Sequence, residues 1–137
     1  MHLILCIDDR GGMLFNRRRQ SQDREVRRDM LSMADGHALW MNAYSAGQFS
    51  EEERSRLHVA EDFLDRAGEE DFCFVEDRPA DLWLDRAKCL VLYRWNRVYP
   101  SDLRLDLAPA LEDRTLLASR DFPGYSHETI TKEVYAR

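Results

Sequence analysis

Long apolar runs are missing from this 137-residue chain. The run near the N-terminus, Leu3 to Ile7, covers five residues and is followed at once by two acids. A membrane-spanning helix needs about 20 apolar residues, and the core of a signal peptide needs about 7 to 15. We therefore expect a cytoplasmic protein that does not enter a membrane.

Cysteine is scarce, and its pattern argues against a disulfide framework. The three cysteines are odd in number and widely spaced, and large apolar residues flank each of them: Cys6, Cys73 and Cys89. This pattern is typical of reduced thiols in a protein core.

Several motifs that mark common enzyme classes are also absent. The chain has no Walker sequence, no G-x-G-x-x-G, no G-x-S-x-G and no close Cys-His pair. Its histidines have neither H-x-H nor H-E-x-x-H spacing, so no zinc site is predicted, and we expect them to be surface or strand residues: His2, His37, His58 and His127.

Length and charge indicate one acidic globular domain over residues 1–137. Hydrophobic residues make up 44% of the chain and charged residues 34%, which suits a protein with a real core. The net charge of −6 argues against nucleic-acid binding by the whole surface. Any recognition of phosphate must therefore be local.

Hydrophobic periodicity predicts an α/β fold. Continuous apolar or alternating segments predict strands at Leu3–Ile7, Ala38–Met41, Leu57–Ala60, Phe72–Val75, Lys88–Trp95, Leu103–Leu107, Thr115–Ser119 and Thr129–Tyr135. Helical spacing and start signals predict helices at Gln22–Met33, after the Ser50/Glu53 capping box, at Glu61–Ala67 and after Pro79. The last third is almost all strand, so we expect a three-layer domain whose central mixed sheet has helices on its faces and antiparallel C-terminal strands.

The segment from Leu3 to Asp23 concentrates the polar chemistry. Asp8 and Asp9 end the first strand, where open α/β sheets bind ligands, and glycines follow them in an expected loop. The two acids could orient a ligand or hold a metal. A role in the turn is the favoured interpretation, since no further spaced metal ligands accompany them.

Three consecutive arginines, Arg17 to Arg19, follow in the same expected loop. Guanidinium groups bind phosphate or carboxylate through two hydrogen bonds, so the run could form a local anion site. The alternative is a solvated surface with ion pairs such as Asp23 with Arg27, which have helical spacing. Both interpretations remain open on sequence alone.

Asp23 stands at the expected start of the first helix. A carboxylate there could be desolvated enough to act as a proton donor or as a hydrogen-bond anchor. It could equally stabilise the helix dipole.

Aromatic residues with interleaved arginines occur near the late strands, at Tyr93, Trp95, Tyr99 and Tyr125. They could stack on bases of a nucleic acid. At strand spacing, core and sheet positions are the favoured interpretation.

The order of these features resembles the dihydrofolate reductase family over nearly the whole chain. Ile4–Asp9, Gly11–Phe15 and Asp23 follow the family's first strand, glycine loop and helix-start carboxylate, and Leu39 to Met41 and Lys88–Tyr93 follow two later strands. Asp102 and Phe122–Tyr135 match the acid and the closing hairpin that come next. The resemblance implies that fold, with Asp23 as the catalytic or anchoring carboxylate.

The sequence departs from the family at the cofactor positions. Asn42 and Ala43 replace a glycine and an arginine, and Glu76, Asp77 and Arg78 replace a glycine pair. Those glycines let backbone amides approach a dinucleotide. The resemblance therefore does not extend to NADPH, and the cofactor is unknown.

A second resemblance covers Asp8 to Asp23 alone. These residues match the D-D-x-x-G-M-L-F-N-x-R-R-Q-S-x-D opening of small, uncharacterised bacterial proteins, some of them labelled ribonuclease Z. The zinc nuclease of that name has an H-x-H-x-D-H motif, which is absent here.

The leading hypothesis is a domain that binds a small polar or phosphorylated ligand, nucleotide- or pterin-like, beside the first strand. Asp23 is the candidate catalytic residue, and the candidate ligand-binding residues are Asp8, Asp9, Asn16, Arg18, Arg19, Gln20 and Asn42. The alternatives are a nucleotide- or RNA-binding module, which is not favoured, and a metal-assisted ribonuclease-type hydrolase at Asp8 and Asp9.

Overall fold

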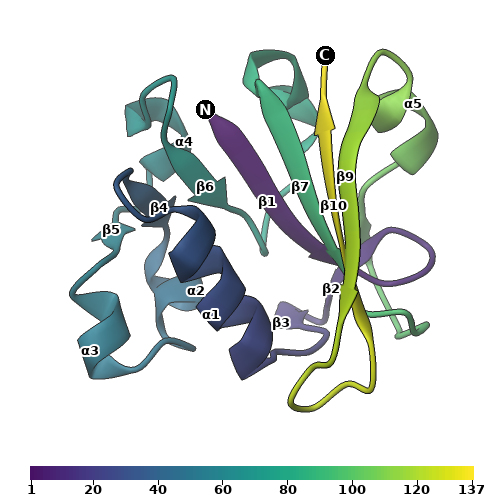
Figure 1. Cartoon of the computed structure of the whole chain (residues 1–137), viewed down its shortest axis with the longest axis horizontal. Coiled ribbons are helices and arrows are strands. Elements are labelled where there is room, and N and C mark those ends of the chain that lie inside the picture. Colours follow the sequence, from purple (N-terminus) through teal and green to yellow (C-terminus); the bar gives the residue numbers. More distant parts are fainter.

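In the computed structural model, which describes residues 1–137, a seven-stranded sheet forms the centre of the protein (Figure 1). The strand order is β5-β4-β6-β1-β7-β10-β9. Along the chain these strands are β1 His2–Ile7, β4 Leu39–Met41, β5 His58–Val59, β6 Phe72–Phe74, β7 Cys89–Arg94, β9 Thr115–Phe122 and β10 Ile130–Ala136.

The sheet is parallel from β5 to β7 and antiparallel at β10 and β9. β1 lies at its centre, and Leu3, Ile4, Leu5 and Ile7 of this strand are fully buried. A continuous apolar run is what a strand covered on both faces requires. The predicted mixed sheet with antiparallel C-terminal strands is thus confirmed.

Helices cover both faces of the sheet, which makes three layers. On one face Val26 and Met30 of α1 pack on Ile4. On the other face Phe63 of α4 and Ala110 of α5 belong to the core around the remaining buried residues of β1. The helices are α1 Arg24–Met33, α2 Ala43–Ala46, α3 Glu51–Arg54, α4 Phe63–Arg66, the 3-10 helix η1 Asp81–Arg86 and α5 Leu107–Leu111.

A second, three-stranded sheet contains most of the expected loop after the first strand. Its order is β3-β2-β8, from β2 Gly12–Phe15, β3 Arg18–Arg19 and β8 Leu103–Arg104. Asn16 and Arg17 connect β2 to β3 with φ values of 50° and 62°. Two left-handed residues are the geometry of a two-residue hairpin turn, in which asparagine is well tolerated. The loop predicted around the arginine run is therefore a β-hairpin, and that prediction was wrong.

Local signals placed several of the smaller elements correctly. The predicted capping box forms, because Ser50 Oγ accepts from the Glu53 N–H and the Glu53 carboxylate accepts from the Ser50 N–H. The helix expected after Pro79 is a 3-10 helix, and α5 was not predicted. No helix in the structure is long and apolar enough to cross a membrane.

All three cysteines are free, as predicted. Burial raises the pKa of the Cys73 thiol to about 12 and also raises that of Cys6.

Gly11, in the connection between β1 and β2, should not tolerate a larger residue. Gly11 has a φ of 76°, and a Cβ added there would lie 2.3 Å from the backbone oxygen of Leu105. We expect Gly11→Ala to lower the free energy of unfolding by about 2 kcal/mol or more, because backbone must move to relieve the clash. Urea denaturation measures the loss. Gly68→Ala is the control, since its Cβ would meet only the Asp71 carboxylate at 3.4 Å; an equal loss in both variants would contradict this account.

Candidate functional site

Asp8 follows β1 directly, and its side chain is fully buried. Its Oδ1 accepts the N–H groups of Arg10 and Gly12, both at 2.8 Å. Its Oδ2 accepts the Tyr99 N–H at 3.1 Å and the Gln20 side-chain amide at 3.0 Å. Burial alone would raise the pKa of this carboxyl, but these donated hydrogen bonds lower it. Asp8 thus organises the turn and offers no free oxygen to a metal.

Asp9, the other predicted acid, is exposed, and its N–H donates to the Arg97 carbonyl at 2.9 Å. The Asp9 side chain forms no hydrogen bond or ion pair with Asp8 or with the residues that follow β4 and β6. No group of three or more histidine, cysteine, aspartate or glutamate side chains is arranged to hold a metal ion.

An ion pair lies beside the end of β6. Glu76 is 6% exposed and Arg19 reaches it from β3 through a fork, with Nε to Oε2 at 3.0 Å and Nη2 to Oε1 at 3.3 Å. Gln48 donates to Oε1 at 3.0 Å. The Arg19 guanidinium also lies 4.3 Å from the ring centre of Tyr44 and donates to its carbonyl at 2.9 Å. Two opposite charges are therefore held together away from water.

Asn42, directly after β4, also connects two segments through its side chain. Its Oδ1 caps α2 by accepting the Ser45 N–H at 3.0 Å, and its Nδ2 donates to both carboxylate oxygens of Asp77 at 3.0 Å. The side chain is 1% exposed. It ties the ends of β4 and β6 together.

Three neighbouring parallel strands, β4, β6 and β1, thus each continue into polar residues at the same edge of the sheet. The β2–β3 hairpin adds two side chains to this edge. We call the group the edge cluster: Asp8, Arg19, Gln20, Asn42, Glu76 and Asp77. Four of its six members were predicted ligand-binding residues.

The other predicted residues of the hairpin face water. Arg18 is exposed and forms no ion pair, and Asn16 is exposed with its N–H donating to Asp102 Oδ2 at 3.0 Å. The pair suggested for Asp23 with Arg27 does not form. Arg18 and Arg17 therefore remain as free cations next to the edge cluster.

Asp23 is the N-cap of α1 and is almost fully buried. Its carboxylate accepts backbone N–H groups from Glu25 at 2.8 Å, Tyr125 at 3.0 Å and Ser126 at 2.7 Å, and also the Ser126 hydroxyl at 3.0 Å. Burial raises the pKa of Asp23, but these hydrogen bonds outweigh it and hold the pKa well below its usual range. The side chain is ionised at neutral pH, which suits an anchor and not a proton donor.

A side-chain network continues from Asp23. His127 is 4% exposed, with Nδ1 3.4 Å from Asp23 Oδ2 and Nε2 2.9 Å from the Tyr99 hydroxyl. Its ring stacks on Trp95 at a centroid distance of 4.5 Å. The expectation that this histidine is a surface or strand residue was wrong. No sequence signal could have found the network, because its members come from segments far apart in the chain.

The aromatic residues of the late strands are largely internal. Tyr93 is fully buried and Trp95 is 3% exposed, which confirms the core interpretation for these two. Tyr125 is 67% exposed and lies under the Arg24 guanidinium.

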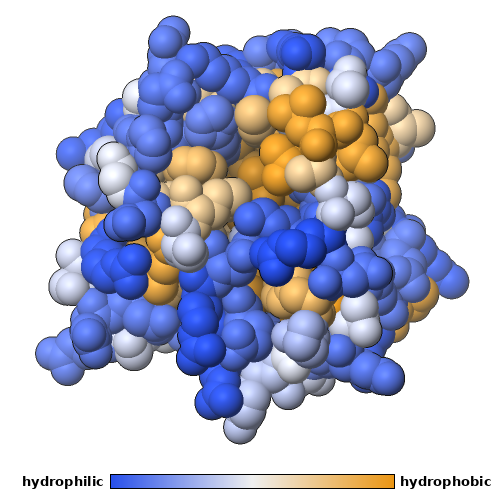
Figure 2. Space-filling model, in the orientation of Figure 1, coloured by the Kyte–Doolittle hydropathy of each residue, from blue (hydrophilic) through white to orange (hydrophobic).

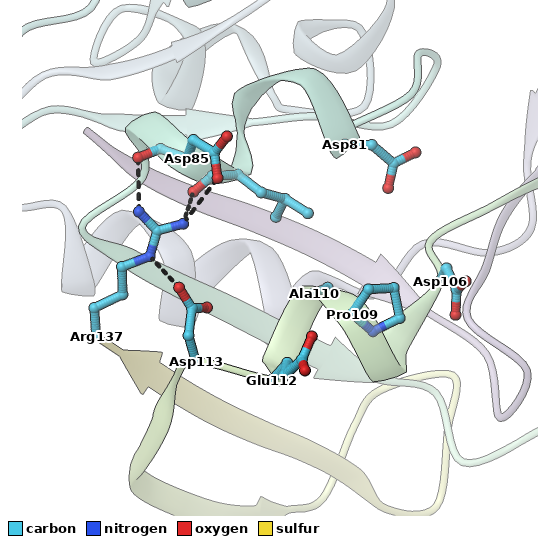
Figure 3. A pocket seen from close by; sticks show the side chains of 9 residues that line it. Asp81, Asp85, Asp106, Pro109, Ala110, Glu112, Asp113 and Arg137 are labelled. Atoms are coloured by element: carbon cyan, nitrogen blue, oxygen red, sulfur yellow. Dashed lines mark hydrogen bonds and ion pairs between the residues drawn. The ribbon is translucent and has the colours of Figure 1, made fainter.

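A cavity of about 710 Å³ lies elsewhere (Figure 3). Acids of η1 and acids that flank α5 line it, and Arg137 bridges two of them, Asp85 at 3.2 Å and Asp113 at 3.3 Å. No predicted site residue lines it. The side chains of the edge cluster, by contrast, are bonded to one another in pairs: Arg19 to Glu76, Gln20 to Asp8 and Asn42 to Asp77.

Comparisons with known proteins identify the fold. No family model matches the chain, and no curated protein matches it by sequence. Among solved structures, a dihydrofolate reductase from Enterococcus faecalis, complexed with NADP(H) and RAB-propyl, is similar with a TM-score of 0.64 and 9% sequence identity. The match covers 99% of this chain and 95% of that chain. The protein has a dihydrofolate reductase-like fold.

The anchoring role of Asp23 can be tested by removing its charge. We expect Asp23→Asn to lower the free energy of unfolding by about 2 kcal/mol, because the new amide nitrogen must face backbone N–H donors. Asp62→Asn is a matched control, since Asp62 is the N-cap of α4 but makes no capping hydrogen bond. Chemical denaturation at neutral pH measures both.

The same variant has a defined pH dependence. Because the pKa of folded Asp23 lies below the unfolded value of about 3.9, its stabilisation is complete above that pH and declines as pH falls further. The stability gap between wild type and Asp23→Asn should therefore narrow in acid. A gap that stays constant down to the acid transition would contradict the anchor role.

Substitutions of Arg19 and Glu76 should have non-additive effects on the free energy of unfolding. Arg19→Met should cost about 3 kcal/mol, because it leaves a buried carboxylate without its counter-charge. The double variant Arg19→Met/Glu76→Gln should recover more than half of this loss. Arg28→Met, in an exposed pair with Glu25, is the control and should cost about 0.5 kcal/mol. Additive losses would show that the two charges act independently.

Proposed function

We propose that this protein binds a small polar ligand, nucleotide- or pterin-like, at the edge cluster under the β2–β3 hairpin. The observation that carries the proposal is the convergence of Asp8, Asn42 and Glu76 from the ends of three adjacent parallel strands. Open α/β sheets bind ligands at this carboxyl edge. Buried polar groups at such an edge supply the few oriented contacts that specify a ligand.

Entry of a ligand requires the hairpin to move. Arg19 and Gln20 fill the edge cluster, and the short β3 pairs with β2 through only two residues, Arg18 and Arg19. The side-chain oxygen Oε1 of Gln20 is buried without a hydrogen-bond partner. A ligand that donates a hydrogen bond to this oxygen offsets part of the cost of lifting the hairpin.

The charged part of the ligand is assigned to the hairpin. Arg17 and Arg18 are exposed and unpaired, whereas the edge cluster contains three carboxylates, of Asp8, Glu76 and Asp77, and one arginine, Arg19. A phosphate or carboxylate would therefore bind at the hairpin, and the donors of a heterocycle would face the acids. Asp23 fixes the start of α1 as a positioning residue in this scheme.

Reduction with NADPH is not part of the proposal. Where the family resemblance leads one to expect glycines, Glu76 and Asp77 occupy the edge with carboxylates that are bound to Arg19 and Asn42. Side chains there take the space of a dinucleotide, and negative charge disfavours its pyrophosphate.

The alternatives have weaker support. An RNA-binding surface would need a row of exposed aromatic rings, and of the four predicted rings only that of Tyr125 is exposed, whereas Tyr93 and Trp95 are buried. Metal-assisted hydrolysis would need free carboxylate oxygens, and those of Asp8 accept four N–H groups. No specific observation favours either function.

A thermal-shift panel tests the proposal with nucleotides, pterins, folates, NADPH, short RNA and divalent ions. A ligand that binds only the native state stabilises it by about 2.7 kcal/mol at a concentration of 100 times its Kd. We expect a rise in Tm with a nucleotide or a pterin and none with NADPH.

Arg18→Ala should weaken that shift several-fold, because it removes a free cation of the hairpin. Arg54→Ala, which removes an exposed arginine of α3, is the matched control and should leave the shift unchanged. No response to any nucleotide or pterin would overturn the proposed function.

A further inference from the structure

β9 leaves one long edge of the central sheet unpaired. It lies at the end of the strand order and bonds only to β10. Seven of its eight residues, Thr115 to Asp121, are exposed. At about 3.4 Å per residue the strand extends over about 27 Å. Free N–H and C=O groups along such an edge can pair with another strand.

An apolar surface adjoins this edge. Leu116 and Leu117 are 47% and 62% exposed, and Val134 and Ala136 on neighbouring β10 are only half-buried. Figure 2 shows the apolar area over the upper ends of β7, β10 and β9. α1 covers the other end of these strands, where its Asp29 contacts Lys132 at 2.8 Å and Arg120 at 2.6 Å. Contiguous exposed apolar surface of this kind marks an interaction site.

We propose that the edge of β9 and the apolar surface beside it form the interface of a homodimer. A two-fold axis across the edge would bring the same strand of a second copy alongside in antiparallel orientation, so one surface would meet its own counterpart. The exposed leucines of both copies would then be covered together.

The lack of charge at the centre of the strand suits pairing with a second copy. Thr115 to Ser119 carry no charge, so antiparallel pairing places no like charges opposite each other over these residues. Arg114, directly before the run, is buried and donates to the carbonyls of Leu84 and Ala87. Arg120, directly after the run, is paired with Asp29 of its own chain. A second copy would therefore meet no unpaired charge along the apolar centre of this edge.

The contact depends on side chains as well as on backbone pairing. A β-bulge leaves Leu117 without a partner on β10, and bulges limit the length of a regular ladder. A stable interface buries about 800 Å² on each partner, so the leucines and the adjoining apolar surface have to contribute much of it.

Sedimentation velocity over roughly a hundredfold range of concentration tests the proposal on the full chain, together with the dependence of Tm on concentration. Wild type should sediment as a dimer at high concentration, with a Tm that rises with concentration. Leu117→Lys should be monomeric, because it would bring two cations together in an apolar contact, and its Tm should not depend on concentration. Leu82→Lys is the matched control, since Leu82 is 81% exposed on η1, and it should remain dimeric.

Circular dichroism of each variant establishes that it is folded, which an exposed position makes the expected result. Three outcomes would overturn the proposal: a monomeric wild type, a folded Leu117→Lys that remains dimeric, and a loss of the dimer in Leu82→Lys. None of these measurements involves a ligand, so they are independent of the edge cluster.

Discussion

The carboxylate of Asp23 is the contact on which the arrangement of the layers depends. It caps α1 and at the same time accepts backbone N–H groups from the connection between β9 and β10. One charged group thereby sets where the helical layer meets the sheet. Space around it is fully used, since a Cβ on Gly124 would lie 2.7 Å from the Asp23 carboxylate. Ionisation of a buried group is stable there because donors replace water.

Hydrogen-bond donors of the protein also take the place of water around the buried carboxylates of the edge cluster. Asp8 is held by N–H groups, whereas Glu76 is held mainly by the Arg19 guanidinium. The two kinds of contact differ in how easily the donor can be replaced. A turn held by backbone donors is permanent as long as the fold is intact, but a side-chain fork can be exchanged for another donor of similar shape. The fold thus combines a fixed anchor with a contact that can be replaced.

Elements whose signals are local were predictable from the sequence. β1 and β7 have continuous apolar runs, α1 has apolar residues on one face, and Ser50 with Glu53 forms the expected cap. The β2–β3 hairpin was missed because Asn16-Arg17 is a weak turn signal and arginines do not indicate a strand. Asp8, Arg19, Gln20 and Asn42 were selected as site residues, but the Arg19–Glu76 and Asn42–Asp77 partnerships, like the position of His127, arise from contacts between distant segments. No pattern within one segment encodes them.

The hydrogen-bond partners of Asp23 are made late in synthesis. Tyr125 and Ser126, whose N–H groups donate to the Asp23 carboxylate, leave the ribosome about 100 residues after it. β1 likewise pairs with β7, formed by Cys89 to Arg94. The N-terminal third of the nascent chain therefore has a helix start without its main hydrogen-bond partners and a central strand without one neighbour. A chain that stalls before its last hairpin therefore leaves the Asp23 carboxylate without the Tyr125 and Ser126 donors that hold it in the complete fold.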